Sequence, residues 1–263
     1  MASATSQALV ADDPDLDVEQ ETGGHAGPCE EGADWNVVER AFLTRRSIRK
    51  FKKKQVPAHL VRRMLEVGRF APSQGNGQPW RFVVVRDAAM IQEMEDDCVA
   101  ACRKIADATD YTAHEKGSLK RTLVELVTRA VTANDPNTAH PVPMQVVRLI
   151  AAGKFTVFHR APTVVLLLMV KRGIGVPEID IGICGTNIVM AAESQRLGTC
   201  WVGFSKLLNQ EPKWRERFGI DERFELSEAI CVGFPVGTPA DHVISRATHE
   251  TSWFENGTKT VVW

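Results

Sequence analysis

Two short segments, about 25 residues apart, place the strongest constraint on how this chain folds. Residues 45–51 read Arg-Arg-Ser-Ile-Arg-Lys-Phe, and residues 71–82 read Ala-Pro-Ser-Gln-Gly-Asn-Gly-Gln-Pro-Trp-Arg-Phe. Three arginines within five residues repel one another unless an anion lies among them, and guanidinium groups bind phosphate through paired hydrogen bonds. The second segment is rich in turn formers and leads into an apolar strand, which can bring backbone close to a flat polar ligand.

Each segment alone also has a plainer interpretation. Seven of the ten residues 45–54 are Lys or Arg, a pattern typical of nuclear-localisation or nucleic-acid patches, and residues 71–79 could be an ordinary loop. However, Ile48 and Phe51 interrupt the basic run at a spacing that indicates a packed element. The net charge of -1 gives no overall attraction to nucleic acid or to an anionic membrane. The longest apolar run, 164–170, is also far short of the roughly 20 residues that span a bilayer. We therefore expect neither nucleic acid nor a membrane as a partner.

Taken together and in this order, the two segments resemble the nitroreductase family of FMN-dependent oxidoreductases. Later motifs extend the resemblance from about Trp35 to Trp253. These are Asp180-x6-Asn187-x3-Ala191-Ala192-x5-Gly198-x-Cys200-Trp201-Val202-Gly203, and Gly233-Phe234-Pro235 followed by Arg246. The resemblance implies an α+β nitroreductase-like fold, in which helices flank a central, mostly antiparallel sheet and two chains form an intertwined homodimer.

The resemblance also assigns cofactor-binding residues. Arg45, Ser47 and Arg246 would clamp the FMN phosphate, and Arg49 would lie near the N1/O2 edge of the flavin, where positive charge stabilises the reduced ring. Pro72, Ser73, Gln74 and Asn76 would close over the ring from the partner subunit, and backbone amides of residues 202–204 would face N5. The full expected set is Arg45, Arg46, Ser47, Arg49, Pro72, Ser73, Gln74, Asn76, Gln78, Val202, Gly203, Phe204 and Arg246.

The implied activity is transfer of hydride from NAD(P)H, through flavin N5, to a nitroaromatic, a quinone or an activated alkene. No catalytic side chain beyond the flavin and no metal are expected, because the cofactor carries the chemistry. Other activities of the family stay open: oxygen-dependent flavin fragmentation to dimethylbenzimidazole, and reductive dehalogenation.

Two positions depart from the pattern of the family. Ile244 stands where many members have a basic residue, and the Glu/Tyr/Lys lid set of deiodinating members cannot be matched around Tyr111, the single tyrosine.

Composition and the family resemblance together divide the chain into regions. Residues 1–33, rich in Asp, Glu and small residues, should form a disordered arm. Residues 34–249 should form the FMN-binding domain, with 106–158 as a variable insert or lid that sets substrate choice. Residues 250–263 should form a C-terminal arm that packs on the partner subunit.

Local patterns predict the elements. We expect helices over 35–43 (capped by Asp34), from Pro57 to before Pro72, over 88–104 (capped by Asp87), over 178–197 (ended by Gly198) and over 207–218. Strands are expected over 81–86, 162–170, 199–204 and 226–234. The six scattered cysteines indicate reduced, mostly buried thiols and a cytoplasmic protein without a secretion signal. The seven histidines are expected at the surface or in satisfied positions.

Overall fold

The computed structural model describes residues 35–110, 115–132, 143–173, 175–239, 242–243 and 250–261. They belong to two units, one spanning Asn36–His242 and one made of Met1–Trp35 with Val243–Trp263. In the described part of the second unit, β5 (Ser252–Glu255) and β6 (Thr258–Val261) form an antiparallel hairpin. The predicted acidic arm over residues 1–33 lies outside the described residues.

The first unit is built on a four-stranded sheet in which β2 (Thr163–Val170) is one of the two inner strands. The strand order is β1-β2-β4-β3, and every neighbouring pair is antiparallel. The other strands are β1 (Trp80–Val85), β4 (Phe224–Gly233) and β3 (Gly198–Val202). The continuous apolar run of β2 is buried on both faces, as its sequence predicts, and the antiparallel sheet confirms the expected α+β class.

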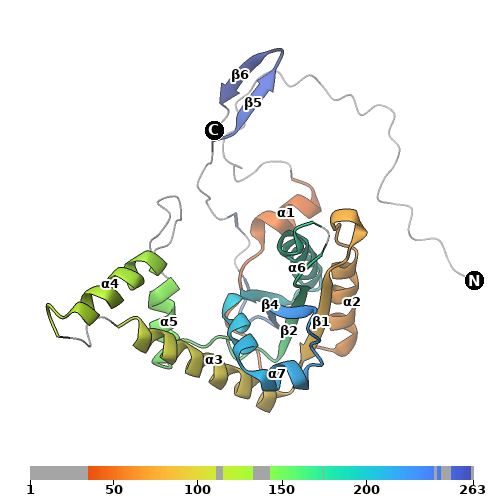
Figure 1. Ribbon diagram of the computed structural model, residues 1–263. Helices are drawn as coiled ribbons and strands as arrows, with labels where there is room; N and C mark the ends of the chain where they lie inside the picture. Colours follow the sequence, from red (N-terminus) through yellow and green to blue (C-terminus); the bar gives the residue numbers. More distant parts are fainter. Residues whose placement is uncertain are drawn as a thin grey trace, which may run out of the picture. The chain divides into compact units, whose positions relative to one another are not determined.

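Helices cover both faces of this sheet (Figure 1). On one face, Val164, Leu166 and Leu168 share a core with α3 (Ala88–Ala108), α5 (Pro143–Ala151) and α7 (Pro212–Arg217). On the other, Val165 and Leu167 pack with α2 (Ala58–Arg69) and α6 (Pro177–Ser194). This arrangement follows from the period of two in β2, because successive side chains point to opposite faces.

Small residues allow α6 to approach both α2 and β3 closely. A Cβ on Gly68 would lie 2.5 Å from Ile188 Cγ1, and one on Gly185 would lie 2.2 Å from the Trp201 ring. Gly182 differs, because a Cβ there would meet nothing within 4 Å. The close contacts therefore depend on Gly68 and Gly185, while Gly182 only extends the pattern.

One of the two predicted helix caps, Asp87, lies among the described residues. Asp87 caps α3 by accepting a hydrogen bond from Met90 N at 2.9 Å, as expected. The short helix α1 (Val37–Thr44) begins later than predicted, because Asn36 caps it and forms a reciprocal capping box with Glu39. The predicted cap, Asp34, lies outside the described residues.

Two boundaries in the C-terminal half of the chain were wrongly predicted. The helix expected over 178–197 ends at Ser194, Arg196 takes the left-handed conformation (φ 57°), and Gly198 is the first residue of β3. The helix expected over 207–218 is two elements, η3 (Gly203–Gln210) and α7, and η3 also takes over the last two residues of the predicted strand 199–204. Glu211 lies between the two elements, and Pro212 begins α7 at the first helical position, where the missing N–H of proline costs no helical hydrogen bond.

The region expected to be an insert contains α4 (Leu119–Thr132) before α5. Leu119, Leu123 and Leu126 of α4 are mostly exposed. Residues 133–142 of this region lie outside the described residues, and α5 begins at Pro143.

The described helices include none with the length and apolarity needed to cross a membrane. The five cysteines among the described residues are free and buried, as their scattered positions predict.

Candidate cofactor site

The basic segment 45–51 lies along the exposed edge of the sheet. Ser47 forms a parallel bridge with Thr199 of β3, and Ile48 N donates to Thr199 O at 2.8 Å. Further on, Phe51 forms an antiparallel bridge with Pro235, just after β4. The segment is therefore held like a short extra strand, with Ser47 and Arg49 exposed and Ile48 half-buried.

Two glycines make this docking possible. A Cβ on Gly198 would lie 2.8 Å from three atoms of Ile48, and one on Gly233 would lie 2.8 Å from the Phe51 ring. Both distances are closer than side-chain atoms can approach. Gly198 is thus required for close contact with the basic segment, and not as the helix stop that the sequence predicted.

The three arginines of the segment have different surroundings. The Arg46 guanidinium donates to the carbonyl groups of Thr44, Arg45 and His242, so its fork is already occupied by backbone. Burial raises the pKa of the Cys200 thiol, while the positive charges of Arg49 and then Arg45 oppose the rise. In the part of the chain that the structure describes, no carboxylate is ion-paired with Arg45 or Arg49. Their charges remain available for an anionic ligand.

The strand β3 connects this cationic end to the segment 202–204. From Thr199 to Val202 the strand advances about 10 Å. At the far end, Ser205 Oγ donates to Val202 O at 2.8 Å, and a Cβ on Gly203 would lie 3.2 Å from Glu228 Oε2. One chain therefore brings the predicted phosphate-binding and N5-facing residues to the two ends of one edge strand.

The second sequence segment forms a tight loop on the N-terminal end of α6. Residues of η1 (Gln74–Asn76) and the next turn include left-handed Asn76 and Gln78, with φ of 54° and 45°. Gln78 N donates to Ser73 Oγ at 3.0 Å, and Gln74 N donates to Asp180 Oδ1 at 3.3 Å. Asp180 is 5% exposed, and within the described residues its Oδ2 has no hydrogen-bond partner.

The loop lies far from the basic segment of the same chain. Thr199, which pairs with Ser47, is opposite Val232 of β4, and Val232 is in turn opposite Thr163 at the start of β2. At the other end of β2, Val170 N donates to Pro79 O beside the loop. The distance along β2 between these levels is about 24 Å. The two sequence segments therefore occupy opposite ends of the sheet, and β3 and β1 are its opposite edges.

A strained turn lies beside the basic segment. His159 and Arg160 both have left-handed backbone, with φ of 51° and 53°. Glu95 stabilises the turn by accepting hydrogen bonds from Val157 N at 2.7 Å and Phe158 N at 2.8 Å. Burial, and secondarily Arg49, lowers the pKa of His159 to about 4, so its imidazole is neutral at pH 7. No local sequence pattern marks His159, because its surroundings depend on Glu95, which is far away in the chain.

Comparison with known proteins identifies the family of the chain. The profile of the nitroreductase family matches residues 43–238. The chain belongs to the nitroreductase family. An NADH dehydrogenase/NAD(P)H nitroreductase of Methanothermobacter thermautotrophicus is 25% identical over 205 residues, covering 77% of this chain and 79% of the relative.

Two further relatives bear on the fold and on the range of activities. The crystal structure of a nitroreductase with bound FMN from Desulfitobacterium hafniense has a TM-score of 0.59 and 21% identity, covering 82% of this chain and 98% of that one. The match shows that the two share a fold. A 5,6-dimethylbenzimidazole synthase of Rhodospirillum rubrum is 38% identical over 97 residues, covering 36% of this chain and 46% of the relative.

Of the residues predicted from the family motifs, Arg246 lies outside the described residues, as do Tyr111 and Ile244. Trp201 was not predicted as a site residue. The carbonyl of Thr199 points outward to Ile48. Backbone polar groups of every second residue in a strand point to the same side, so those of Trp201 also point outward, between the two ends of the candidate site. The Trp201 ring packs on Gly185, which fixes this part of the edge from behind.

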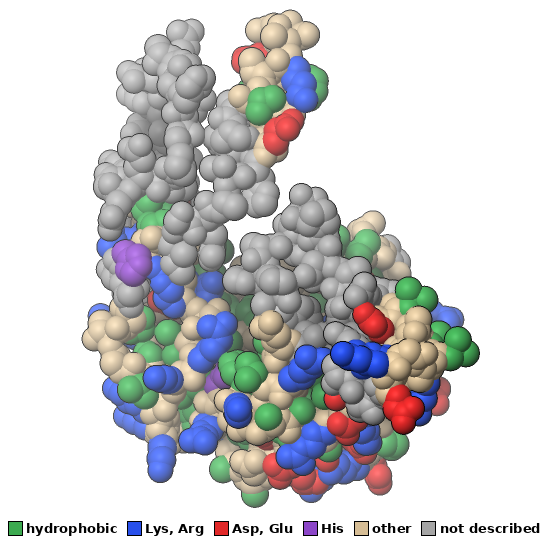
Figure 2. Space-filling view, turned by 90° about the vertical axis from the view of Figure 1, so that its left-hand side faces the viewer, with side chains coloured by type: hydrophobic (Ala, Val, Ile, Leu, Met, Phe, Trp, Pro, Cys, Tyr) green, Lys and Arg blue, Asp and Glu red, His purple; other side chains and the backbone are tan. Residues whose placement is uncertain are grey.

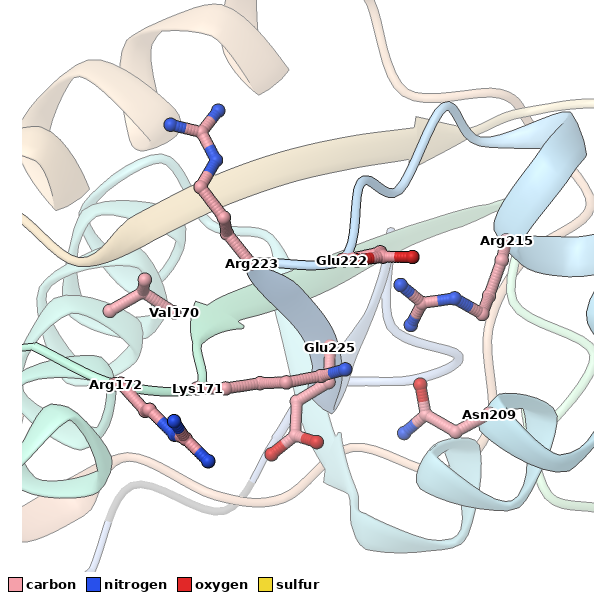
Figure 3. Close-up of a pocket in the computed structure, with 8 residues that line it drawn as sticks. All are labelled: Val170, Lys171, Arg172, Asn209, Arg215, Glu222, Arg223 and Glu225. Atoms are coloured by element: carbon pink, nitrogen blue, oxygen red, sulfur yellow. The ribbon is translucent and has the colours of Figure 1, made fainter.

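A hollow of about 860 Å³ lies elsewhere, at the ends of β2 and β4 (Figure 3). Its charges are mixed, with Lys171 and Arg172 near Glu225 in the view, and Arg215 donates to backbone carbonyls at residues 220, 221 and 224. None of the predicted cofactor residues lines this hollow. It therefore does not compete with the edge of β3 as the cofactor site.

Lys and Arg side chains do not merge into one basic surface on the face shown in Figure 2, where apolar and acidic groups lie between them. Together with the net charge of -1, this distribution does not favour the nucleic-acid interpretation of residues 45–54.

Proposed function

We propose that this chain is an FMN-dependent oxidoreductase that passes hydride from NAD(P)H to a small acceptor such as a nitroaromatic, a quinone or an activated alkene. The observation that carries the proposal is the docking of residues 45–51 along β3, which leaves Arg45 and Arg49 without a carboxylate partner among the described residues. Bound FMN would supply the hydride-transfer chemistry. The chain's own residues would bind the cofactor, orient it and set its charge environment.

The arrangement fits an elongated anionic cofactor. Arg45 and Ser47 would hold the phosphate with a charge-assisted and a neutral hydrogen bond, and Arg246 would join them as the family motif implies. Arg49 would place positive charge at the pyrimidine edge of the ring. Toward the other end of β3, the outward backbone of residues 201–204 would face the ring, where Gly203 leaves space beside it.

A homodimer would complete the site. The loop 72–78 lies about 24 Å along the sheet from the basic segment of its own chain. A second copy can instead supply the loop, so that each site would combine β3 of one chain with the loop of the other. Exposed apolar side chains on α1, directly after α2 and on α6 support such an interface. They include Val37, Phe42, Phe70 and Ile179.

The first test is the visible spectrum of the purified protein. The proposal predicts a yellow protein with one FMN per chain, whose flavin absorbance is bleached by NADH or NADPH and recovers on adding an acceptor. A protein that stays colourless after incubation with FMN would contradict it. Oxygen-dependent loss of the flavin with release of dimethylbenzimidazole would instead support the activity of the Rhodospirillum relative.

A further inference from the structure

We propose that Asp180 is a positioning residue for the cofactor site, because its carboxylate holds the loop 73–78 in the conformation that covers FMN. This inference rests on the proposed function, in which that loop completes the site of the second chain. The argument comes from the burial of Asp180, from the strained backbone of the loop and from the hydrogen bond that joins them.

The side chain of Asp180 is buried, although a carboxylate is costly to remove from water. The residue lies in the first turn of α6 and is 5% exposed. Its Oδ1 accepts a hydrogen bond from Gln74 N at 3.3 Å, whereas its Oδ2 has no partner within the described residues. In the part of the chain that the structure describes, the loop amide is therefore the hydrogen-bond donor that this buried carboxylate serves.

The loop itself has a strained backbone. Gly75, Asn76 and Gln78 have left-handed φ, of 59°, 54° and 45°. For residues with a side chain this conformation costs energy and persists only where the surroundings enforce it. Within the described residues, the other hydrogen bonds of the loop join its members to one another or to the adjacent Trp80. Among these bonds, only the one to Asp180 fixes the loop to another element of the fold.

A second contact holds the same residue of the loop. A Cβ on Gly175, just before α6, would lie 2.1 Å from Gln74 Oε1 and 2.6 Å from Gln74 Cδ. Gly175 also has a left-handed φ of 84°, so glycine is required here for two reasons. The side chain of Gln74 thus lies against the backbone before α6, while its amide donates to Asp180. Both contacts act on a residue that the family motif places over the flavin ring.

A carboxylate is well suited to fix this turn. A hydrogen bond from a backbone N–H to a carboxylate is stronger than one to a neutral oxygen. Asp180 binds the amide of the first residue of η1, so it fixes the place where the turn begins. In the proposed homodimer, the residues that follow would lie over FMN bound by the other chain. Asp180 therefore acts on the cofactor of the second chain through the loop and not by contact.

The contact can be tested without FMN. In the apoprotein, amide hydrogen exchange of Gln74 should be at least about tenfold faster in Asp180→Ala than in wild type, because the N–H loses its acceptor. Asp180→Asn keeps an oxygen acceptor and should exchange at a rate closer to wild type. Glu178→Ala, which removes an exposed carboxylate from the same turn of α6, should leave the rate unchanged. Equal rates in wild type and Asp180→Ala would overturn the inference.

The role of the contact is tested by FMN affinity and by the stability of the apoprotein. Asp180→Ala should bind FMN at least about tenfold more weakly, because the loop is displaced from the ring. Its midpoint of thermal unfolding should stay within about 3 °C of wild type, since the change also removes a buried oxygen without a partner among the described residues. Asp180→Asn and Glu178→Ala should each lose less than about threefold in affinity.

Three outcomes of these measurements would overturn the role. They are unchanged FMN affinity in Asp180→Ala, an equal loss in Asp180→Asn, and a much lower unfolding midpoint in Asp180→Ala, which would show that the residue serves the fold of its own chain.

Heterodimers separate an effect on the loop from a general effect on the chain. One chain carries Arg45→Ala with Arg49→Ala, so FMN binds at the basic segment of the other chain, under the loop of the arginine-substituted chain. Asp180→Ala in the arginine-substituted chain should weaken this one site at least about tenfold. Asp180→Ala in the other chain should leave the affinity at the wild-type level, because the loop over the bound FMN is then unchanged.

Equal affinities of the two heterodimers, or the opposite order, would overturn the inference. If wild type itself binds no FMN, the proposed function fails. If wild type binds FMN and only the Asp180 variants behave unexpectedly, this inference alone fails.

Discussion

Replacing Gly198 with alanine should push the basic segment off β3. The new Cβ would lie 2.8 Å from Cβ, Cγ1 and Cγ2 of Ile48, about 1 Å closer than carbon atoms pack. Moving Ile48 outward by that distance would stretch its 2.8 Å hydrogen bond to Thr199 beyond bonding range. Overpacking costs about 1–3 kcal/mol and the lost hydrogen bond about 1 kcal/mol, so we expect a loss of about 2–4 kcal/mol.

Urea unfolding of the apoprotein measures this loss, and an FMN titration measures its effect on the site. FMN affinity should fall at least about tenfold, because the shift moves Ser47 and Arg49 away from their positions on the edge. Gly182→Ala is the matched control: its Cβ meets nothing within 4 Å, and alanine favours a helix by about 1 kcal/mol over glycine. The Gly182→Ala protein should be at least as stable as wild type.

A double-mutant cycle identifies the cause. Ile48→Ala removes two of the three clashing atoms, so it should recover part of the stability lost in Gly198→Ala, with a coupling of about 1 kcal/mol or more. If Gly198→Ala retains wild-type stability and FMN affinity, the close docking of residues 45–51 on β3 is not what shapes the site.

Three other predictions concern the phosphate contact, the insert and a surface ion pair. Arg45→Ala should weaken FMN binding by roughly 1.5–3 kcal/mol, or about 10- to 150-fold, whereas Lys53→Ala should not; equal losses would show a general charge effect. A glycine-serine linker in place of residues 134–143 should leave FMN binding intact and change the ranking of kcat/KM among a nitroaromatic, a quinone and an enone; loss of FMN with an unchanged ranking would assign the segment to the cofactor site. The hydrogen bond from Arg223 to Asp221, aided by the charge of Arg81, lowers the pKa of the Asp221 carboxyl to about 2. The carboxylate therefore stabilises the fold fully above its unfolded pKa of about 3.8, and this contribution is lost as pH falls through about 2. Asp221→Asn should therefore lower Tm at pH 7 and progressively less below pH 4, and a constant difference in Tm from pH 7 to pH 2.5 would refute the ion pair's role.

Features with a local cause were predictable from sequence. The apolar run of β2 requires burial on both faces, and Asp87 stands directly before the apolar pattern of α3. In α2, Val61 and Met64 are three positions apart and both are buried, as expected for residues on one face of a helix. In each case the residues that decide the local structure are only a few positions apart in the chain.

Features decided by long-range contacts were not predictable. Gly198 looked like a helix stop, because its partner Ile48 is 150 positions earlier in the chain. Arg46 looked equivalent to its neighbours until the structure placed it against backbone carbonyls, including that of His242. His159 carried no signal at all, since its position depends on Glu95 and on the register of β3 and β4.

The most direct test of the proposed site uses two complementary variants. One chain carries Arg45→Ala with Arg49→Ala, and the other carries a glycine-serine replacement of residues 73–78. Each variant alone should form homodimers that bind little FMN, because each lacks half of every site. A purified heterodimer, selected with two different tags, has one site with both halves intact if the loop is supplied by the second chain.

We therefore predict one FMN per heterodimer, measured as the ratio of flavin to protein absorbance after gel filtration. If basic segment and loop of the same chain formed the site, both sites of the heterodimer would be defective. A heterodimer without FMN, or monomeric wild-type protein that retains FMN, would contradict the account.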